Sequence, residues 1–241
     1  MADIHANREA FEACLAHARG QSPDRFVYLG DYVNYGADPE WVVAELMRQA
    51  EAGAVVLLGN HDAAVGKRGS TMTSPAELAL EWTRVQLGAA ERGFLAGLPL
   101  TRQEDDRFFV HADPAAPSRW GYVTDVQQAG RGMRTTAGRI TICGHVHKPA
   151  IYSLSPASKI TAFRPVDGVP VPLLAQRRWL AVVGSVGQPR DGNPAAAYAL
   201  LDTTAGELTT FRVAYDVEAA AGKIRAAGLP EMLAERLQWG A

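Results

Sequence analysis

Four short apolar runs, each followed at once by polar or turn residues, constrain the fold of this sequence most. The runs are RFVYLGD (25–31), AVVLLGNHD (54–62), DRFFVHAD (106–113) and RITICGHVH (139–147). An apolar run of this length bounded by turn residues is typical of a buried β-strand. A helical pattern separates the first run from the second, and the order strand, helix, strand favours a largely parallel sheet covered by helices. The sequence therefore predicts an α/β fold.

The remaining segments add helices and a second sheet. Helical patterns occur at 8–18, at 39–52, in an insertion at about 70–100, and at 217–238, where residues 228–230 interrupt the pattern. From residue 150 onward, short β-rich segments separated by Pro and Gly turns predict an antiparallel sheet. The sequence shows no internal repeat, linker or low-complexity stretch. We therefore expect residues 1–241 to form a single domain.

Composition and charge exclude several classes of function. The 241 residues are 47% hydrophobic and 21% charged, and the formal net charge is -2, as in an ordinary globular protein. This balance favours neither duplex nucleic acid nor a membrane surface as a partner. No apolar run is long enough to cross a bilayer, and the start, MADIHANREA, does not resemble a signal peptide. With two cysteines, Cys14 and Cys143, we expect a reduced, cytoplasmic protein.

Side chains that can carry chemistry gather in turns and just after the apolar runs. They are five of the six histidines, three carboxylates and one amide: His5, His61, His111, His145, His147, Asp3, Asp31, Asp62 and Asn60. In an open α/β sheet the carboxyl ends of the strands meet at one edge, so residues distant in sequence converge there. Imidazole, carboxylate and carboxamide groups are nitrogen and oxygen donors for metals. The sequence therefore predicts a metal site at this edge.

Taken one at a time, most of these motifs have ordinary explanations. The D-x-H at 3–5 is a short triplet, the G-D at 30–31 fits a plain turn, and His111 alone fits a core histidine. The G-H-x-H at 144–147 is more specific, because alternate positions of a strand point to the same face. In their order along the chain, D-x-H, G-D, G-N-H-D, H and G-H-x-H are poorly explained by chance.

This ordered set resembles the calcineurin-like metallophosphoesterase superfamily, with the motifs spread over residues 3–147. Farther on, GSVGQPRDGNP (184–194) and the segment 215–240 are similar to a bacterial subgroup that includes diadenosine-tetraphosphate hydrolase-type enzymes. The resemblance implies a four-layer α/β sandwich, in which two mixed β-sheets lie face to face with helices outside. The metal site then lies at one edge between the sheets.

The resemblance also implies a role for each motif residue. It implies that one metal ion is bound by Asp3, His5 and His147. The second ion is then bound by Asn60, His111 and His145, and Asp31 bridges both ions. Two metal ions of this kind lower the pKa of bound water, so that hydroxide is available at neutral pH to attack phosphorus. His61 is then expected to protonate the leaving oxygen or to stabilise its developing charge. Asp62 is expected to orient His61, with a solvent-facing turn residue as the alternative.

The implied function is metal-dependent hydrolysis of a phosphoester or nucleotide phosphoanhydride. The partner is thus a small phosphorylated substrate, and the subgroup resemblance favours dinucleoside polyphosphates. The resemblance favours manganese or iron, and the donor set also allows zinc, nickel or cobalt. One alternative is a scaffold module that kept the fold and lost the chemistry. Another is a protein serine/threonine phosphatase, but Tyr35 and Asp62 stand where those enzymes carry arginine and glutamate.

The start of the sequence departs from the family pattern. The family normally has a whole apolar strand before the D-x-H, whereas two residues precede Asp3 here. The resemblance therefore implies a truncated first strand, unless the natural chain extends upstream of Met1. A truncated strand is expected to leave Asp3 and His5 on a frayed terminus that holds its metal ion weakly. We also expect a gap beside the central strands that lowers stability.

Three further residues are open to two interpretations. Arg190, in a P-R-D-G turn, has the side chain that best binds a substrate phosphate. Such a sequence is nevertheless more often a Gly- and Pro-rich β-turn with an exposed arginine. Tyr32 and Tyr35 flank the Asp31 loop and could stack on a base, although ordinary packing of the loop is expected.

Overall fold

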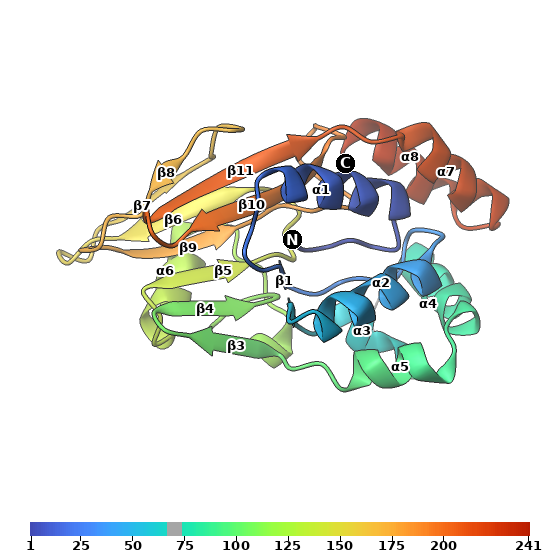
Figure 1. Cartoon of the computed structure of the whole chain (residues 1–241), viewed down its shortest axis with the longest axis horizontal. Helices are drawn as coiled ribbons and strands as arrows, with labels where there is room; N and C mark the ends of the chain where they lie inside the picture. Colours follow the sequence, from blue (N-terminus) through green and yellow to red (C-terminus); the bar gives the residue numbers. More distant parts are fainter. Residues whose placement is uncertain (67–73) are drawn as a thin grey trace.

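The structure, a computed structural model, describes residues 1–66 and 74–241. Figure 1 shows strands through the middle of the molecule and helices on the outside. The part of the chain that the structure describes contains no helix long and apolar enough to span a bilayer.

The larger sheet has six strands in the order β3-β4-β5-β9-β6-β7. Its strands are β3 (Thr101–Glu104), β4 (Arg107–Val110), β5 (Ile140–Cys143), β6 (Ala150–Leu154), β7 (Ile160–Phe163) and β9 (Arg178–Val182). The central strands β4, β5 and β9 are parallel, and β3, β6 and β7 add antiparallel edges. The parallel core explains why β5 is apolar at nearly every position, since both of its faces are covered.

The opposite layer consists of two short sheets. Strands β1 (Val27–Tyr28) and β2 (Val55–Val56) form a parallel pair. Strands β10 (Ala196–Asp202), β11 (Glu207–Val213) and β8 (Val171–Pro172) form an antiparallel sheet in the order β10-β11-β8. Backbone hydrogen bonds connect the two sheets through irregular segments: Leu29 N–H to Met1 O (3.0 Å), Val186 N–H to Ala2 O (3.0 Å) and Ala197 N–H to Ser185 O (2.8 Å). The two sheets therefore act as one layer.

A shared core joins the two layers. Leu29, Leu57 and Leu208 of the β1/β10 layer pack with Phe109 and Ile142 of the six-stranded sheet. Each such buried side chain stabilises the fold by about 1.5–3 kcal/mol. The predicted α/β class, with sheets face to face and helices outside, is confirmed.

Helices cover the outer faces of both layers. They are α1 (Arg8–Gly20), α2 (Pro39–Glu51), α3 (Asn60–Val65), α4 (Ser74–Gln86), α5 (Ala89–Ala96), α6 (Val126–Thr135), α7 (Val217–Ala226), α8 (Glu231–Trp239) and the 3-10 turn Pro117–Arg119. Helices α1 and α2 pack on β1 and β10, and α6 packs on β4, β5 and β9. Asn7 caps α1 by accepting the N–H of Ala10 at 3.1 Å, and Pro39 opens α2.

Two sequence predictions concern helical segments. Within the expected insertion at about 70–100, α4 and α5 are helical, while residues 70–73 lie outside the described residues. The expected helix at 217–238 is a pair, α7 and α8, separated at residues 228–230 as the Gly-Leu-Pro sequence indicates. Figure 1 shows this pair side by side at one end of the molecule.

The start of the chain is held more firmly than we expected. Asp3 and His5 are buried, at 0% and 1% exposure, rather than frayed. The N–H of Asp3 donates to Gly30 O and that of His5 to Asp31 O, both at 3.0 Å. From the other side, Gly187 N–H donates to Asp3 O at 2.9 Å. Backbone hydrogen bonds thus hold Asp3 from two sides, and His5 O also accepts the N–H of Gly36 at 3.0 Å, contacts that a frayed terminus would lack.

Candidate metal centre

The loops at the carboxyl ends of several strands meet at one edge of the molecule. Residues 30–36 follow β1, residues 59–62 follow β2, His111 follows β4, and residues 144–147 follow β5. Residues 3–5 lie beside the loop after β1. The structure thereby brings together all seven residues predicted as metal ligands, six of them buried and Asn60 half-buried: Asp3, His5, Asp31, Asn60, His111, His145 and His147.

A first cluster consists of Asp3, His5 and His147. Their donor atoms lie within 4.8 Å of one another. His5 Nε2 is 3.2 Å from His147 Nε2, and His147 Nε2 is 3.2 Å from Asp3 Oδ1. The buried Asp3 Oδ1 accepts no hydrogen bond of regular geometry from the described residues. A buried carboxylate oxygen of this kind is costly unless a cation balances it.

A second cluster surrounds His111 Nε2. This nitrogen is 3.1 Å from Asp31 Oδ2, from Asn60 Oδ1 and from His145 Nδ1. Asp31 Oδ2 is also 4.0 Å from His5 Nε2 in the first cluster. The Asp31 carboxylate therefore stands between the two clusters.

Outer hydrogen bonds orient the four cluster histidines. In each ring one nitrogen contacts a backbone carbonyl: His5 Nδ1 with Val33 O (3.2 Å), His111 Nδ1 with Leu29 O (3.0 Å), His145 Nε2 with Trp120 O (2.9 Å) and His147 Nδ1 with Gln188 O (2.6 Å). A carbonyl only accepts, so the contacting nitrogen carries the proton and the inward nitrogen of a neutral ring presents a lone pair. If all four rings were neutral, these lone pairs would face and repel each other, 3.2 Å apart between His5 and His147 and 3.1 Å apart between His111 and His145. A cation between them removes this repulsion, so the donor set fits two metal ions.

The pKa values of His111 and Asp31 also indicate that the site attracts positive charge. Burial alone would lower the pKa of His111, but the Asp31 carboxylate against its Nε2 raises that pKa to about 9. Burial would raise the pKa of Asp31, yet the surrounding histidines hold that pKa well below its ordinary value. Asp31 therefore stays ionised and holds a proton on His111 in a place where a metal ion would supply the charge.

The backbone is strained at the same residues. Asp3, His5, Asp31, His145 and His147 have φ angles of 55°, 50°, 58°, 67° and 62°. Non-glycine residues rarely adopt this left-handed conformation, which costs of order 1–3 kcal/mol at each position. Such strain persists where the surrounding structure over-determines it, and it concentrates at functional sites.

Two motif glycines leave room for the carboxylates. A Cβ at Gly59 would lie 2.2 Å from Asp31 Oδ1, and a Cβ at Gly144 would lie 2.6 Å from Asp3 Oδ2. The N–H of His61 donates to Asp31 Oδ1 at 2.9 Å, and that of His145 donates to Asp3 Oδ2 at 2.9 Å. Glycine at these positions therefore lets the strand-end backbone approach and orient the two carboxylates.

His61 lies at the inner edge of both clusters, with its Nε2 3.9 Å from Asp31 Oδ2. Its Nδ1 is 2.8 Å from the amide nitrogen of Asn34. That amide nitrogen also donates to Ala76 O at 3.1 Å, and Asn34 Oδ1 accepts the N–H of Tyr35 at 2.8 Å. The amide nitrogen is thus the donor, His61 Nδ1 accepts, and the ring proton lies on Nε2. Burial lowers the pKa of His61 to about 4, so the ring is neutral.

The structure places Asp62 differently from its expected role. The buried carboxylate accepts the N–H groups of Asp31 (2.8 Å), Tyr32 (2.9 Å) and Gly59 (3.0 Å). The side chain that hydrogen-bonds the His61 ring is that of Asn34, which the sequence analysis did not single out. Asn34 occupies the turn of the Asp31 loop with a φ of 72°, and an asparagine in a turn gives no separate signal in one sequence. Asp62 therefore positions the Asp31 loop rather than the His61 ring.

This structural role of Asp62 leads to a prediction about the free energy of unfolding. Asp62→Ala leaves three buried N–H donors without an acceptor, at about 1–3 kcal/mol each. We expect the free energy of unfolding in urea to fall by at least about 3 kcal/mol, with the m-value unchanged. Asp125→Ala, which removes an exposed helix cap, is the control and should cost about 1 kcal/mol. Equal losses for the two variants would contradict the role of Asp62.

Arg190 is half-buried beside the site rather than exposed on its turn. Its N–H donates to His147 O at 3.2 Å, and its guanidinium carbon lies 5.8 Å from the centre of the Tyr35 ring. One terminal nitrogen donates to Gln188 Oε1 at 2.9 Å. The buried Nε has no hydrogen-bond partner among the described residues. The Tyr35 ring lies 4.8 Å from that of His61, so Arg190 brings a cation next to the clusters.

An aromatic face borders the second cluster. The Tyr122 ring stacks on His145, with 4.2 Å between ring centres and 14° between planes, and is 52% exposed. In contrast, Tyr32 is fully buried, and its hydroxyl bonds to the carbonyls of Tyr28 and Leu57. Of the two tyrosines, Tyr122 is thus the one available to a bound molecule, and Tyr32 packs the loop as expected.

Comparisons with known proteins agree with this arrangement. Residues 1–206 match the calcineurin-like phosphoesterase superfamily domain. An uncharacterised protein of Methanocaldococcus jannaschii is 33% identical over 251 residues, covering 100% of this chain and 96% of that protein. A metallophosphoesterase from Sphaerobacter thermophilus is 33% identical and has a TM-score of 0.89, with 100% of this chain and 97% of that chain covered. A hypothetical protein from Pyrococcus horikoshii OT3 shares the fold, with a TM-score of 0.82 at 18% identity over 100% of this chain and 97% of that chain.

The fold and the facing clusters of histidine and aspartate define a metal-dependent phosphoesterase class. This chain belongs to the calcineurin-like phosphoesterase superfamily. The family predicted from the motifs is thereby confirmed, and with it a hydrolase framework for small phosphorylated substrates.

Proposed function

We propose that this protein hydrolyses phosphoesters or nucleotide phosphoanhydrides with two metal ions. The observation that carries the proposal is the pair of clusters that share Asp31, in which the inward nitrogens of paired histidines lie only 3.2 Å and 3.1 Å apart. Asp3, His5 and His147 would hold one ion and Asn60, His111 and His145 the other. Asp31, which stands between the clusters, would contact both ions.

When bound, the two ions supply positive charge for the phosphoryl oxygens and make hydroxide available near neutral pH. Imidazole and oxygen donors favour manganese or iron in this proposal, and zinc, nickel or cobalt also suit them. The ligands of the chain keep the site cationic, because Asn60 contributes a neutral oxygen in place of a third carboxylate. The strained backbone and the outer hydrogen bonds hold these ligands in place before substrate arrives.

His61 is the residue that we propose to stabilise the leaving oxygen. Its proton lies on Nε2, which faces the centre of the site, and the ring is neutral because it is buried. A hydrogen bond from this N–H would stabilise the negative charge that develops on the leaving oxygen as the P–O bond breaks. Asn34 holds the ring by donating to Nδ1, so that Nδ1 does not carry the proton.

Two features favour a nucleotide among the small phosphorylated substrates. Tyr122 offers an exposed aromatic face beside the second cluster, where a base could stack. Arg190 offers a guanidinium with a free buried Nε near the first cluster, which suits the additional phosphates of a polyphosphate. We therefore propose a nucleotide substrate, with dinucleoside polyphosphates as the first to test.

The test is a substrate panel with the metal-loaded protein. Manganese- and iron-loaded enzyme would be assayed with a phenyl monoester, an aryl phosphodiester, a cyclic nucleotide and diadenosine tetraphosphate. We expect kcat/KM to be highest for the dinucleoside polyphosphate. Highest turnover of the monoester would overturn the nucleotide assignment. No turnover of any substrate with any divalent metal would overturn the proposed hydrolase function.

The position of Arg190 makes a separate prediction about substrate binding. Arg190→Met removes a charge-assisted contact to phosphate of about 1.5–3 kcal/mol. We expect KM for the preferred nucleotide to rise by roughly 10- to 100-fold, with little change in kcat for the phenyl monoester. Arg164→Met, which removes an exposed arginine, is the matched control. An unchanged KM for the nucleotide in Arg190→Met would show that this guanidinium does not bind substrate.

A further inference from the structure

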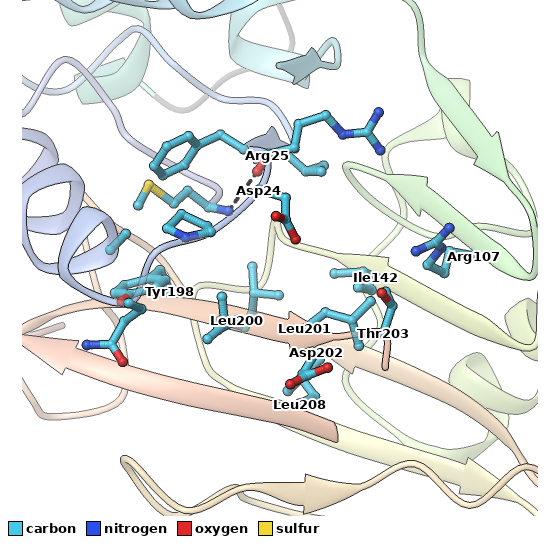
Figure 2. Close-up of a pocket in the computed structure, with 18 of the residues that line it drawn as sticks. Asp24, Arg25, Arg107, Ile142, Tyr198, Leu200, Leu201, Asp202, Thr203 and Leu208 are labelled. Atoms are coloured by element: carbon cyan, nitrogen blue, oxygen red, sulfur yellow. Dashed lines mark hydrogen bonds between the residues drawn. The ribbon is translucent and has the colours of Figure 1, made fainter. Parts of the chain in front are cut away.

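The cavity at the amino end of β1 carries arginines that already have carboxylate partners. It has a volume of about 750 Å³, and Figure 2 shows Arg25 and Arg107 beside it. Arg25 forms an ion pair with Glu104, and Arg107 forms one with Asp105. The charges of both arginines are thus balanced within the chain, so neither is free to bind an anion.

Arg236 of α8 differs from these arginines. It is half-buried, and within residues 1–66 and 74–241 its side chain forms no ion pair and donates no hydrogen bond. By contrast, Arg225 of the adjacent helix α7 is exposed and pairs with Glu231. Removal of a charge from water is costly, so a partly buried arginine normally has a carboxylate partner. Arg236 is therefore available to a bound anion.

Helix α8 places Arg236 beside the first metal cluster. Leu233 and Leu237, on either side of Arg236 along the helix, pack with Tyr35 in one buried cluster. The Tyr35 ring in turn lies 4.6 Å from the ring of His5, measured between ring centres. Tyr35, His5 and Leu237 also border one small cavity. The helix that carries Arg236 thus packs directly against the wall of the first cluster.

The charge of Arg236 reaches the Tyr35 hydroxyl. Burial raises the pKa of Tyr35, and the positive charges of Arg190 and Arg236 act against this rise. Arg190 lies near the same ring, with its guanidinium carbon 5.8 Å from the ring centre. Two cations from different segments of the chain are therefore close to one phenol group.

The end of α8 fixes the turn that carries Arg190. Gly192 N–H donates to Gly240 O at 2.9 Å, which ties this turn to the residue that follows α8. The two backbones are so close that a Cβ at Gly240 would lie 2.6 Å from the carbonyl carbon of Asn193. The relative positions of Arg190 and Arg236 are thus set by backbone contacts before any ligand arrives.

The chemistry of this group of side chains suits a phosphate. Guanidinium groups bind phosphate oxygens through charge-assisted and often bidentate hydrogen bonds, and a phenol hydroxyl can donate one more. Asp191, the carboxylate next to Arg190 in the turn, is already paired with Arg212. Arg190 therefore keeps its charge for a ligand, as Arg236 does.

We propose that Arg236, together with Arg190 and the Tyr35 hydroxyl, forms an anion subsite that binds a phosphate group of the substrate other than the one hydrolysed at the metal centre. The subsite, which presupposes the proposed hydrolase function, makes α8 part of the substrate site. A substrate with linked phosphates fills the metal centre and the subsite together, whereas a monoester fills the metal centre alone. The enzyme would therefore select phosphoanhydrides over phosphomonoesters.

The first experiment compares Arg236→Met with the wild-type protein in manganese-loaded form. We expect kcat/KM for diadenosine tetraphosphate to fall roughly 10- to 100-fold, and the loss for phenyl phosphate to be at least about tenfold smaller. Arg225→Met is the matched control from the same helix pair and should stay within about twofold of the wild type for both substrates. Equal losses of Arg236→Met for the two substrates, or no loss for the dinucleotide, would overturn the subsite.

A binding measurement separates the subsite from turnover. Inorganic tripolyphosphate would be titrated into the metal-free full chain in a calorimeter. We expect the Kd to rise at least about tenfold in Arg236→Met and to stay unchanged in Arg225→Met. An equal Kd in all three proteins would overturn the subsite even if the protein proves to be a hydrolase. Absence of turnover with every substrate would instead overturn the hydrolase function, and a Kd that depends on Arg236 would still support an anion site.

Discussion

Asp31→Asn is expected to lower kcat by at least about 10³-fold and to reduce the metal content from two ions per chain to fewer than one. The Asp31 carboxylate stands between the clusters, 3.1 Å from His111 Nε2 and 4.0 Å from His5 Nε2. The asparagine side chain keeps the shape but removes the negative charge that offsets two dications. Loss of several kcal/mol of charge stabilisation at both sites corresponds to a loss of this size.

The measurement pairs steady-state kinetics with elemental analysis of protein dialysed against manganese. Asp125→Asn is the matched control. Asp125 caps helix α6 and is not one of the candidate metal ligands, and asparagine is an equally good cap. Removal of metal from the wild-type protein with a chelator should abolish turnover, and added manganese should restore it. A variant at Asp31 that keeps two ions and full turnover would falsify the shared-carboxylate site.

The positions of the candidate ligands could be predicted because each follows an apolar run. The carboxyl ends of parallel strands meet at one edge of the sheet, whatever the length or conformation of the loops between them. The residues of the D-x-H, G-D, G-N-H-D and G-H-x-H motifs therefore converge even though 142 residues separate His5 from His147. Pattern and topology together are sufficient for this part of the site.

The roles of neighbouring residues could not be predicted in the same way. Asp62 is adjacent to His61 in sequence, yet at the start of α3 its carboxylate turns toward the backbone of the Asp31 loop. Asn34 reaches the His61 ring from another loop. Arg190 packs over Tyr35 because its backbone bonds to the carbonyl of His147. Each of these contacts depends on the tertiary packing of loops, which a periodic pattern does not encode.

The lengths of the strands could not be predicted from the sequence either. The apolar runs at 25–31 and 54–62 form strands of two residues each, β1 and β2. A strand is defined by its pairing, and β1 has a single strand neighbour in the part of the chain that the structure describes.

His61→Gln is expected to lower kcat by about 10²- to 10⁴-fold while the metal content stays at the wild-type level. The ring presents its Nε2 proton to the centre of the site and is not one of the seven candidate ligands. Loss of one positioned hydrogen-bond donor to developing charge costs about 10²- to 10³-fold in kcat, which lies within this range. Glutamine fills much of the same space, but the contact from Asn34 no longer fixes a ring N–H toward the leaving oxygen.

The leaving group separates stabilisation of the leaving oxygen from a purely structural effect. A nitrophenolate leaves without a proton, whereas an alkoxide or a nucleoside hydroxyl needs one. We therefore expect the loss in His61→Gln to be smaller for an aryl ester than for an alkyl ester by at least about tenfold. His17→Gln is the control, because His17 bonds the hydroxyl of Tyr198 away from the metal clusters. An equal loss for both esters would assign His61 to positioning, since a distorted site slows every leaving group alike.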